Sequence, residues 1–174
     1  GLEPSCLLTL RDEIPGLLPG EEARAVADAA RMFEEYVAER ADEGRFAADL
    51  ASPAPRILLH GHCHQKAFDV MPAVERTLRL LPETEVSTVT TSCCGMAGAF
   101  GYGKDTVAQS MAMGELDLFP AVRSAPDETL VVADGTSCRH HIADGTGRPA
   151  VHVAKVLDMA LMTHRRDDEH STAH

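Results

Sequence analysis

The chain has 174 residues, 44% hydrophobic and 25% charged, so it can form one globular domain whose core is mainly aliphatic. Its 27 acidic and 16 basic residues give a net charge of −11, which disfavours binding to nucleic-acid phosphates or to anionic lipid. No apolar run approaches the ~20 residues of a membrane span, and no stretch has the pattern of a secretory signal. We therefore expect a cytoplasmic protein, with a peripheral association with the inner membrane as a second option.

The first 55 residues are predicted to form a linker and one helix. Prolines and glycines recur over residues 1–20, which predicts a loop, and apolar residues at helical spacing predict a helix over 21–42 that Gly44 can end. The chain begins at Gly1 rather than at Met, so we expect a piece of a longer protein.

Strands and helices are predicted to alternate over residues 56–164. Short apolar runs at 56–60, 86–89 and 130–133 predict buried strands, and 150–152 a short extended piece. Helices are predicted near 65–81 and 105–122 and after residue 152, with a Gly-rich loop over 91–103. Continuously apolar strands that alternate with helices predict an α/β fold with a parallel sheet flanked by helices. The polar tail at 165–174 is predicted to be disordered.

Four cysteines follow the ends of three predicted strands. Cys63 follows the first strand, Cys93 and Cys94 the second, and Cys138 the third, each in a predicted loop. Because the carboxyl ends of parallel strands meet at one edge of a sheet, we expect these thiols to lie together. The pattern predicts one cysteine-ligated metal centre. The alternative is that they are apolar cysteines buried in the core.

Residues beside the cysteines are candidates for supporting the centre. His62 and His64 flank Cys63 and could donate hydrogen bonds to it, and Gly95 would let the backbone approach the bound group closely. If the first strand continued, His60 would share one side with these two histidines. For His60 itself we favour a structural role.

The residue pattern alone leaves the chemistry of the site open. Adjacent cysteines without a CxxC pair favour an iron–sulfur cluster over a zinc knuckle, but zinc remains an alternative. A thiol–disulfide redox enzyme, with Cys63 or Cys138 paired to a nearby histidine, is a second alternative. A phosphate-binding glycine loop is disfavoured, because the sequence Gly-Lys-Ser/Thr is missing from it.

Three motifs resemble the cysteine-rich CCG repeat. They occupy residues 60–67, 93–102 and 133–139. This repeat occurs in the B subunit of heterodisulfide reductase, in the iron–sulfur subunits of glycolate oxidase and of anaerobic glycerol-3-phosphate dehydrogenase, and in related proteins. The details are most similar to the C-terminal region of fused FAD-linked oxidases of the D-lactate and D-2-hydroxyglutarate dehydrogenase type.

The resemblance implies an electron-transfer module. Residues 56–164 would form one CCG repeat that binds a [4Fe–4S] cluster through Cys63, Cys93, Cys94 and Cys138. Residues 1–55 would include the tail of a preceding repeat, with Cys6 as a ligand of that repeat's site. Upstream FAD and ferredoxin-like domains of the same polypeptide would oxidise a 2-hydroxy acid, and electrons would leave to an acceptor. The fragment alone would then lack the substrate-oxidising site.

One position departs from the repeat. Many members close it with a CxxC pair, but Gly135 stands where the first cysteine of that pair would be. Four cysteines therefore remain in the repeat, which favours a simple [4Fe–4S] cluster, or zinc in an air-exposed preparation.

Overall fold

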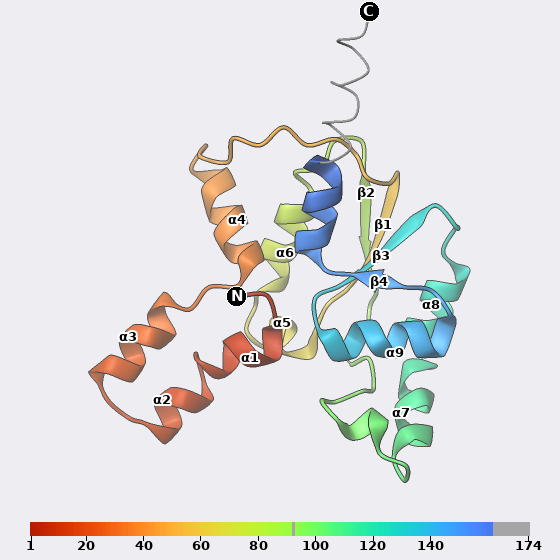
Figure 1. The fold of residues 1–174 in the computed structure, drawn as a ribbon, viewed down its shortest axis with the longest axis horizontal. Helices are drawn as coiled ribbons and strands as arrows, with labels where there is room; N and C mark the ends of the chain where they lie inside the picture. The colour runs from red at the N-terminus through yellow and green to blue at the C-terminus, as the bar shows by residue number, and fades with distance from the viewer. Residues whose placement is uncertain (92, 162–174) are drawn as a thin grey trace, which may run out of the picture.

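The computed structural model describes residues 1–91 and 93–161, and its centre is a four-stranded parallel sheet (Figure 1). The strands are β1 (Arg56–His60), β2 (Glu85–Thr88), β3 (Thr129–Ala133) and β4 (Ala150–Val151), in the spatial order β2-β1-β3-β4. All three pairings are parallel, and β1 pairs with β3 along its whole length. The predicted α/β fold with a parallel sheet flanked by helices is confirmed.

Helices cover both faces of the sheet (Figure 1). The helices are α1 (Pro4–Thr9), α2 (Glu13–Leu17), α3 (Glu21–Ala29), α4 (Phe33–Asp42), α5 (Cys63–Ala67), α6 (Met71–Leu78), α7 (Val107–Gly114), α8 (Leu118–Ser124) and α9 (Thr136–Thr146), with a 3-10 turn at Phe100–Tyr102. Residues 153–161 form a further helical segment.

Side chains that alternate along the strands build two separate cores. Ile57 and Leu59 of β1 pack with α4, α6 and the 153–161 segment on one face. Leu58 of the same strand packs with α8, α9 and the cysteines on the other face. Because successive side chains of a strand point to opposite faces, His60 at the end of β1 falls on the face of Leu58 and the cysteines.

The N-terminal region contains more helix than predicted. Residues 1–20 hold α1 and α2 rather than a loop, and Pro4 suits the first turn of α1, where no amide hydrogen is needed. The helix predicted over 21–42 breaks into α3 and α4. At the break, the Arg11 guanidinium donates to the carbonyl of Ala30 at 2.7 Å and pairs with Glu35, so long-range contacts replace the helical hydrogen bonds.

Two other predicted helices are also divided. Pro72 lies in the first turn of α6, so the stretch over 65–81 splits into α5 and α6 around Asp69, whose φ is 54°. Pro120 lies near the start of α8, after the break that separates it from α7. The predicted disordered tail at 165–174 lies outside the described residues. In the described part of the chain, no helix is long and apolar enough to cross a membrane.

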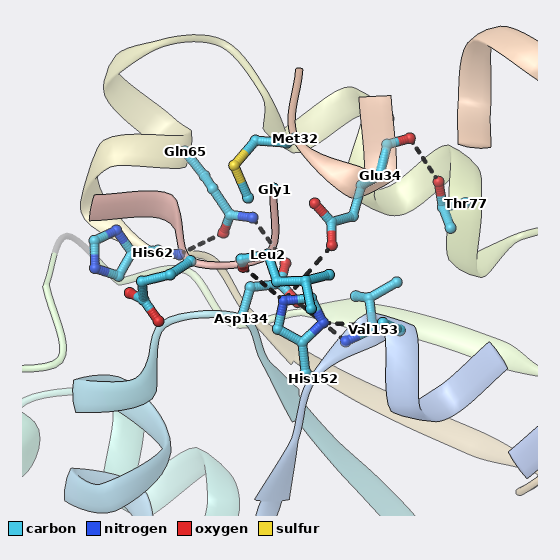
Figure 2. A network of polar contacts seen from close by, with 12 residues as sticks. Gly1, Leu2, Met32, Glu34, His62, Gln65, Thr77, Asp134, His152 and Val153 are labelled. Carbon is cyan, nitrogen blue, oxygen red and sulfur yellow. Dashed lines mark hydrogen bonds and ion pairs between the residues drawn. The ribbon is translucent and has the colours of Figure 1, made fainter. Parts of the chain in front are cut away.

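A buried polar network fastens residues 1–2 and α4 to the end of β3 (Figure 2). Asp134 accepts hydrogen bonds from the Gln65 amide at 2.7 Å and from the Val153 amide at 3.0 Å. The ring of His152 lies 3.4 Å from the Asp134 carboxylate and 3.8 Å from that of Glu34. Glu34 is fully buried, and neither of its oxygens has a hydrogen-bond partner in the described residues.

Burial, together with the nearby Asp134 carboxylate, raises the pKa of Glu34 from 4.5 to about 8. Between these two pKa values the folded protein keeps the proton on Glu34, whereas the unfolded chain releases it. The stability that protonated Glu34 contributes at low pH is therefore lost as pH rises from 4.5 to about 8. We expect the free energy of unfolding to fall across that window, by at most about 1.4 kcal/mol per pH unit. Glu34→Gln should flatten the slope, whereas exposed Glu22→Gln should not. Denaturant unfolding at several pH values measures this, and equal slopes for the two variants would contradict it.

Candidate metal centre

The three cysteine-bearing segments meet at the carboxyl edge of the sheet. After the neighbouring strands β1 and β3, the chain continues on opposite faces of the sheet, into α6 after β1 and into α9 after β3. Open α/β sheets bind ligands at such a topological switch point. A cavity of about 320 Å³ lies there, which we name the cysteine cavity. Its lining residues are Ser5, His62, Cys63, His64, Cys93, Cys94, Ala97, Gly98, Ser137 and Cys138. The structure therefore brings together all four predicted cysteines.

Cys63 is the first residue of α5 rather than part of a loop. The strand ends at His60, so the condition for placing three histidines on one side is not met. Instead His62 caps the helix: its Nδ1 accepts the His64 amide at 3.2 Å, and its own amide donates to the Gln65 side chain at 3.0 Å. These reciprocal bonds fix the turn that presents Cys63.

Gln65 ties this turn to the end of β3. Its side-chain oxygen holds the His62 amide while its nitrogen donates to the buried Asp134 carboxylate (Figure 2). Asp134 directly precedes Gly135 and lies four residues before Cys138. One chain of hydrogen bonds thus fixes the Cys63 segment relative to the Cys138 segment.

The CCG loop (residues 93–103) directs backbone amides at its own cysteines. The Gly95 amide donates to Cys93 Sγ at 3.3 Å, and the Met96 amide donates to Cys94 Sγ at 3.5 Å. Gly95 has φ +104°, and a Cβ there would lie 2.4 Å from the carbonyl oxygen of Ser110, so only glycine fits. The Ser110 hydroxyl in turn donates to the Gly95 carbonyl at 2.8 Å, which fastens the loop to α7.

Cys138 lies in the first turn of α9, not in the predicted loop. Glu3 accepts from the amide and the hydroxyl of Thr136 at 3.0 and 2.8 Å, so the N-terminal segment caps this helix. Cys138 and Cys94 are both buried, whereas Cys93 is half-buried and Cys63 exposed. The centre therefore has a buried side and an open side.

The two buried thiols lie close enough to shift each other's pKa. The neighbouring Cys138 thiol lowers the pKa of Cys94 to about 3, against the opposing effect of burial, and the Met96 amide lowers it further. The same contact, with burial, raises the pKa of Cys138 well above its usual range. The lowered pKa of Cys94 favours its thiolate, the form that binds metals. Burial and the nearby Cys93 raise the pKa of the Cys63 thiol.

His62 occupies space that a side chain at position 135 would need. A Cβ on Gly135 would lie 2.4 Å from the His62 ring and 3.2 Å from Cys138 Sγ. Glycine at position 135 therefore leaves room for this imidazole beside Cys138. His64 stacks on His62 with ring centroids 5.2 Å apart, and its Nδ1 lies 3.8 Å from Cys63 Sγ.

His60, for which we expected a structural role, lies next to two of the thiols. It is 1% exposed, and neither ring nitrogen has a hydrogen-bond partner among the described residues. A ring nitrogen, Cys94 Sγ and Cys138 Sγ all lie within 4.8 Å of one another. The signal in the sequence was its position: the last residue of a buried strand, on the same face as the cysteines.

Cys6 does not line the cysteine cavity. It is exposed on α1, although its neighbour Ser5 forms part of the wall of the cavity.

Two basic residues near the cysteines hold backbone carbonyls. Arg139 donates to the Ala133 carbonyl at 3.1 Å and thus holds the end of β3. Lys66 donates to the Thr91 carbonyl beside the CCG loop. Burial lowers the pKa of Lys66, an effect that the neighbouring cysteines partly offset.

Comparison with known proteins finds distant relatives among dehydrogenase subunits. The C subunit of the anaerobic glycerol-3-phosphate dehydrogenase of Escherichia coli strain K12 is 27% identical over 158 residues, which cover 90% of this chain. The same subunit from Escherichia coli O157:H7 matches equally well. No family model matches the chain, and no solved structure matches it.

The alignment spans 39% of the length of these relatives. It nevertheless covers nearly all of this chain, so it includes the three cysteine-bearing segments and the sheet that positions them. The chain is thus a distant homologue of part of a subunit of an anaerobic dehydrogenase.

Proposed function

We propose that this chain is the iron–sulfur electron-transfer module of a larger FAD-linked 2-hydroxy-acid dehydrogenase. The observation that carries the proposal is that Cys63, Cys93, Cys94 and Cys138 come from three strand ends and line one cavity. The homology to a dehydrogenase subunit supports a redox role.

The donor set fits an iron–sulfur cluster. Four thiols are the ligands that a [4Fe–4S] cluster uses, and a lining with both cysteines and backbone amides supplies thiolates together with donors for sulfide. The lowered pKa of Cys94 favours the thiolate that a metal needs, and Cys138, whose pKa is raised, would release its proton when the metal binds.

A bound cluster would accept and release single electrons. The chain's own residues would set its surroundings: the Gly95 and Met96 amides donate to sulfur, and His62 lies beside Cys138. Hydrogen bonds to sulfur stabilise added electrons and so tune the potential. The exposed Cys63 and the half-buried Cys93 mark the side through which a redox partner could approach.

The larger context follows from the resemblance to fused FAD-linked oxidases. In that context residues 56–164 form a CCG repeat and residues 1–55 carry the tail of a preceding one, with Cys6 serving the other repeat's site. FAD and ferredoxin-like domains of the same polypeptide would deliver electrons, and an acceptor would take them. Cys6 is exposed and lies outside the cysteine cavity, which is consistent with that separate role.

A zinc site that stabilises the same domain is the second candidate. His60, Cys94 and Cys138 offer three close and buried donors, a mixed nitrogen and sulfur set that zinc accepts readily. Zinc is colourless and redox-inactive, so metal analysis with a visible spectrum separates the two candidates.

Replacing a buried cysteine should abolish cluster binding. We expect Cys94→Ser and Cys138→Ser to lose iron and sulfide together, because each removes a thiolate from the buried side. Wild type, purified and reconstituted without oxygen, should hold about four iron and four sulfide per chain, with absorption near ~400 nm. The measurement is iron, sulfide and zinc content with the visible spectrum.

Cys6→Ser is the matched control and should retain the full metal content. Variants of Cys94 and Cys138 that kept wild-type iron and spectrum would sink the iron proposal. Stoichiometric zinc without colour would favour the second candidate. A metal-free protein whose Cys94 and Cys138 form a disulfide would instead favour a thiol–disulfide enzyme.

Gly135→Ala should weaken metal binding by crowding His62. The added methyl would lie 2.4 Å from that ring and 3.2 Å from Cys138 Sγ, so the imidazole must move. We expect a loss of metal affinity of about 10–100-fold, as for other residues that orient ligands. Competition with a chelator measures it. Gly16→Ala, where no atom lies within 4 Å of the added methyl, is the control, and equal affinities for the two variants would contradict the role of His62.

A further inference from the structure

His60 is buried beside two thiols. It is 1% exposed, and both ring nitrogens lack a hydrogen-bond partner in the described part of the chain. An unsatisfied buried polar group costs about 1–3 kcal/mol, so such a residue needs an explanation. Buried His141, by contrast, donates from Nε2 to the Ser110 carbonyl at 3.1 Å.

The surroundings of His60 identify what it faces. It ends β1, on the sheet face that carries Cys94 and Cys138, and a ring nitrogen lies within 4.8 Å of both sulfurs. Ligands of one tetrahedral ion, with bonds of about 2.0 Å to nitrogen and 2.3 Å to sulfur, lie roughly 3.5 Å apart. A small adjustment of the three side chains would therefore bring them all to a single ion such as Zn²⁺ or Co²⁺, whereas one iron of a [4Fe–4S] cluster would take only one of them.

We propose that His60 is a direct ligand of the metal centre, an imidazole donor on the buried side beside Cys94 and Cys138. The inference rests on the proposed function only in requiring that the cysteines hold a metal. The site then offers five candidate donors, four thiols and one imidazole, and in a [4Fe–4S] cluster, which takes four protein ligands, His60 would bind in place of one thiol. A coordinated metal would satisfy a ring nitrogen that has no hydrogen-bond partner among residues 1–91 and 93–161.

An imidazole ligand has a consequence for the redox potential. It is neutral, whereas a thiolate is negative, and replacing thiolate by histidine raises the potential of iron–sulfur centres. We therefore expect His60→Cys to lower the reduction potential of the iron-loaded protein. A ligand role can thus be measured without any substrate.

The decisive experiment uses protein in which all histidines carry nitrogen-15. The iron-loaded chain is reduced without oxygen, and pulsed EPR measures the nitrogen hyperfine coupling. We expect the strong coupling of a coordinated nitrogen in wild type, its loss in His60→Ala, and its persistence in His140→Ala. His140 is the control because it lies two residues from Cys138 yet is exposed and bonded to the Tyr102 hydroxyl at 2.7 Å.

Rescue guards against a variant that loses the coupling merely because its fold is disturbed. Far-UV circular dichroism of His60→Ala reports its fold, and added nitrogen-15 imidazole should enter the vacated space and restore the strong coupling. Restoration supports direct ligation by His60. A wild-type cluster with full iron content but no strong coupling, or a coupling that survives in His60→Ala, overturns it while the proposed function stands.

A wild-type chain that binds no iron would overturn the proposed function, and Co²⁺ then decides the role of His60. The same labelled protein is loaded with Co²⁺ and measured in the same way. Loss of the nitrogen coupling in His60→Ala, with at least a 100-fold loss of Co²⁺ affinity, supports ligation. The threshold is set at 100-fold because loss of a residue that only orients a ligand reduces metal affinity by roughly 10–100-fold. Equal Co²⁺ affinity and coupling in His60→Ala and wild type overturn it.

Discussion

The buried carboxylate of Asp134 holds together the parts of the chain that make the centre. It accepts from Gln65, which orients the turn before Cys63, and from the Val153 amide at the start of the 153–161 segment. Hydrogen bonds to a charged group contribute about 1.5–3 kcal/mol each, and a buried charge without them would be very costly. The spacing between the Cys63 and Cys138 segments therefore depends on this one side chain.

The topology of the sheet explains why the site forms at this edge. β1 and β3 are neighbours whose following helices, α6 and α9, cover opposite faces, so the chain diverges where both strands end. The CCG loop enters the gap from β2, and its cysteines join the core on the side of α9. The result is a centre with Cys94 and Cys138 inside and Cys63 at the surface. Such a gradient from buried to exposed suits a group that must exchange electrons with a partner.

Much of this arrangement could be predicted from the sequence. The apolar runs around 57, 87 and 131 predicted three parallel strands, and the positions of the cysteines after them predicted one cluster of thiols. Both predictions need only the period of the strands and the rule that ligands gather at their carboxyl ends. The fold is confirmed and the four thiols line one cavity; that they hold an iron–sulfur cluster stays a prediction.

The features that sequence reasoning missed depend on contacts between distant residues. The break between α3 and α4 is set by Arg11, and the helical start of α9 is capped by Glu3, which is 133 residues away. His60 was assigned a structural role because histidines are often partly buried without chemistry. It differs from such a residue in being fully buried next to two sulfurs, with no hydrogen-bond partner in the part of the chain that the structure describes.

The N-terminal residues 1–6 contribute to the site itself. Glu3 caps the helix of Cys138, Ser5 lines the cysteine cavity, and the Leu2 carbonyl accepts from His152, 2.8 Å away. These bonds place α1 across the edge of the sheet, next to α5 (Figure 1). If residues 1–6 end a preceding repeat, as the resemblance implies, then one repeat helps to wall the centre of the next. In that case movement of the preceding repeat would act on the Cys138 segment through the bonds between Glu3 and Thr136.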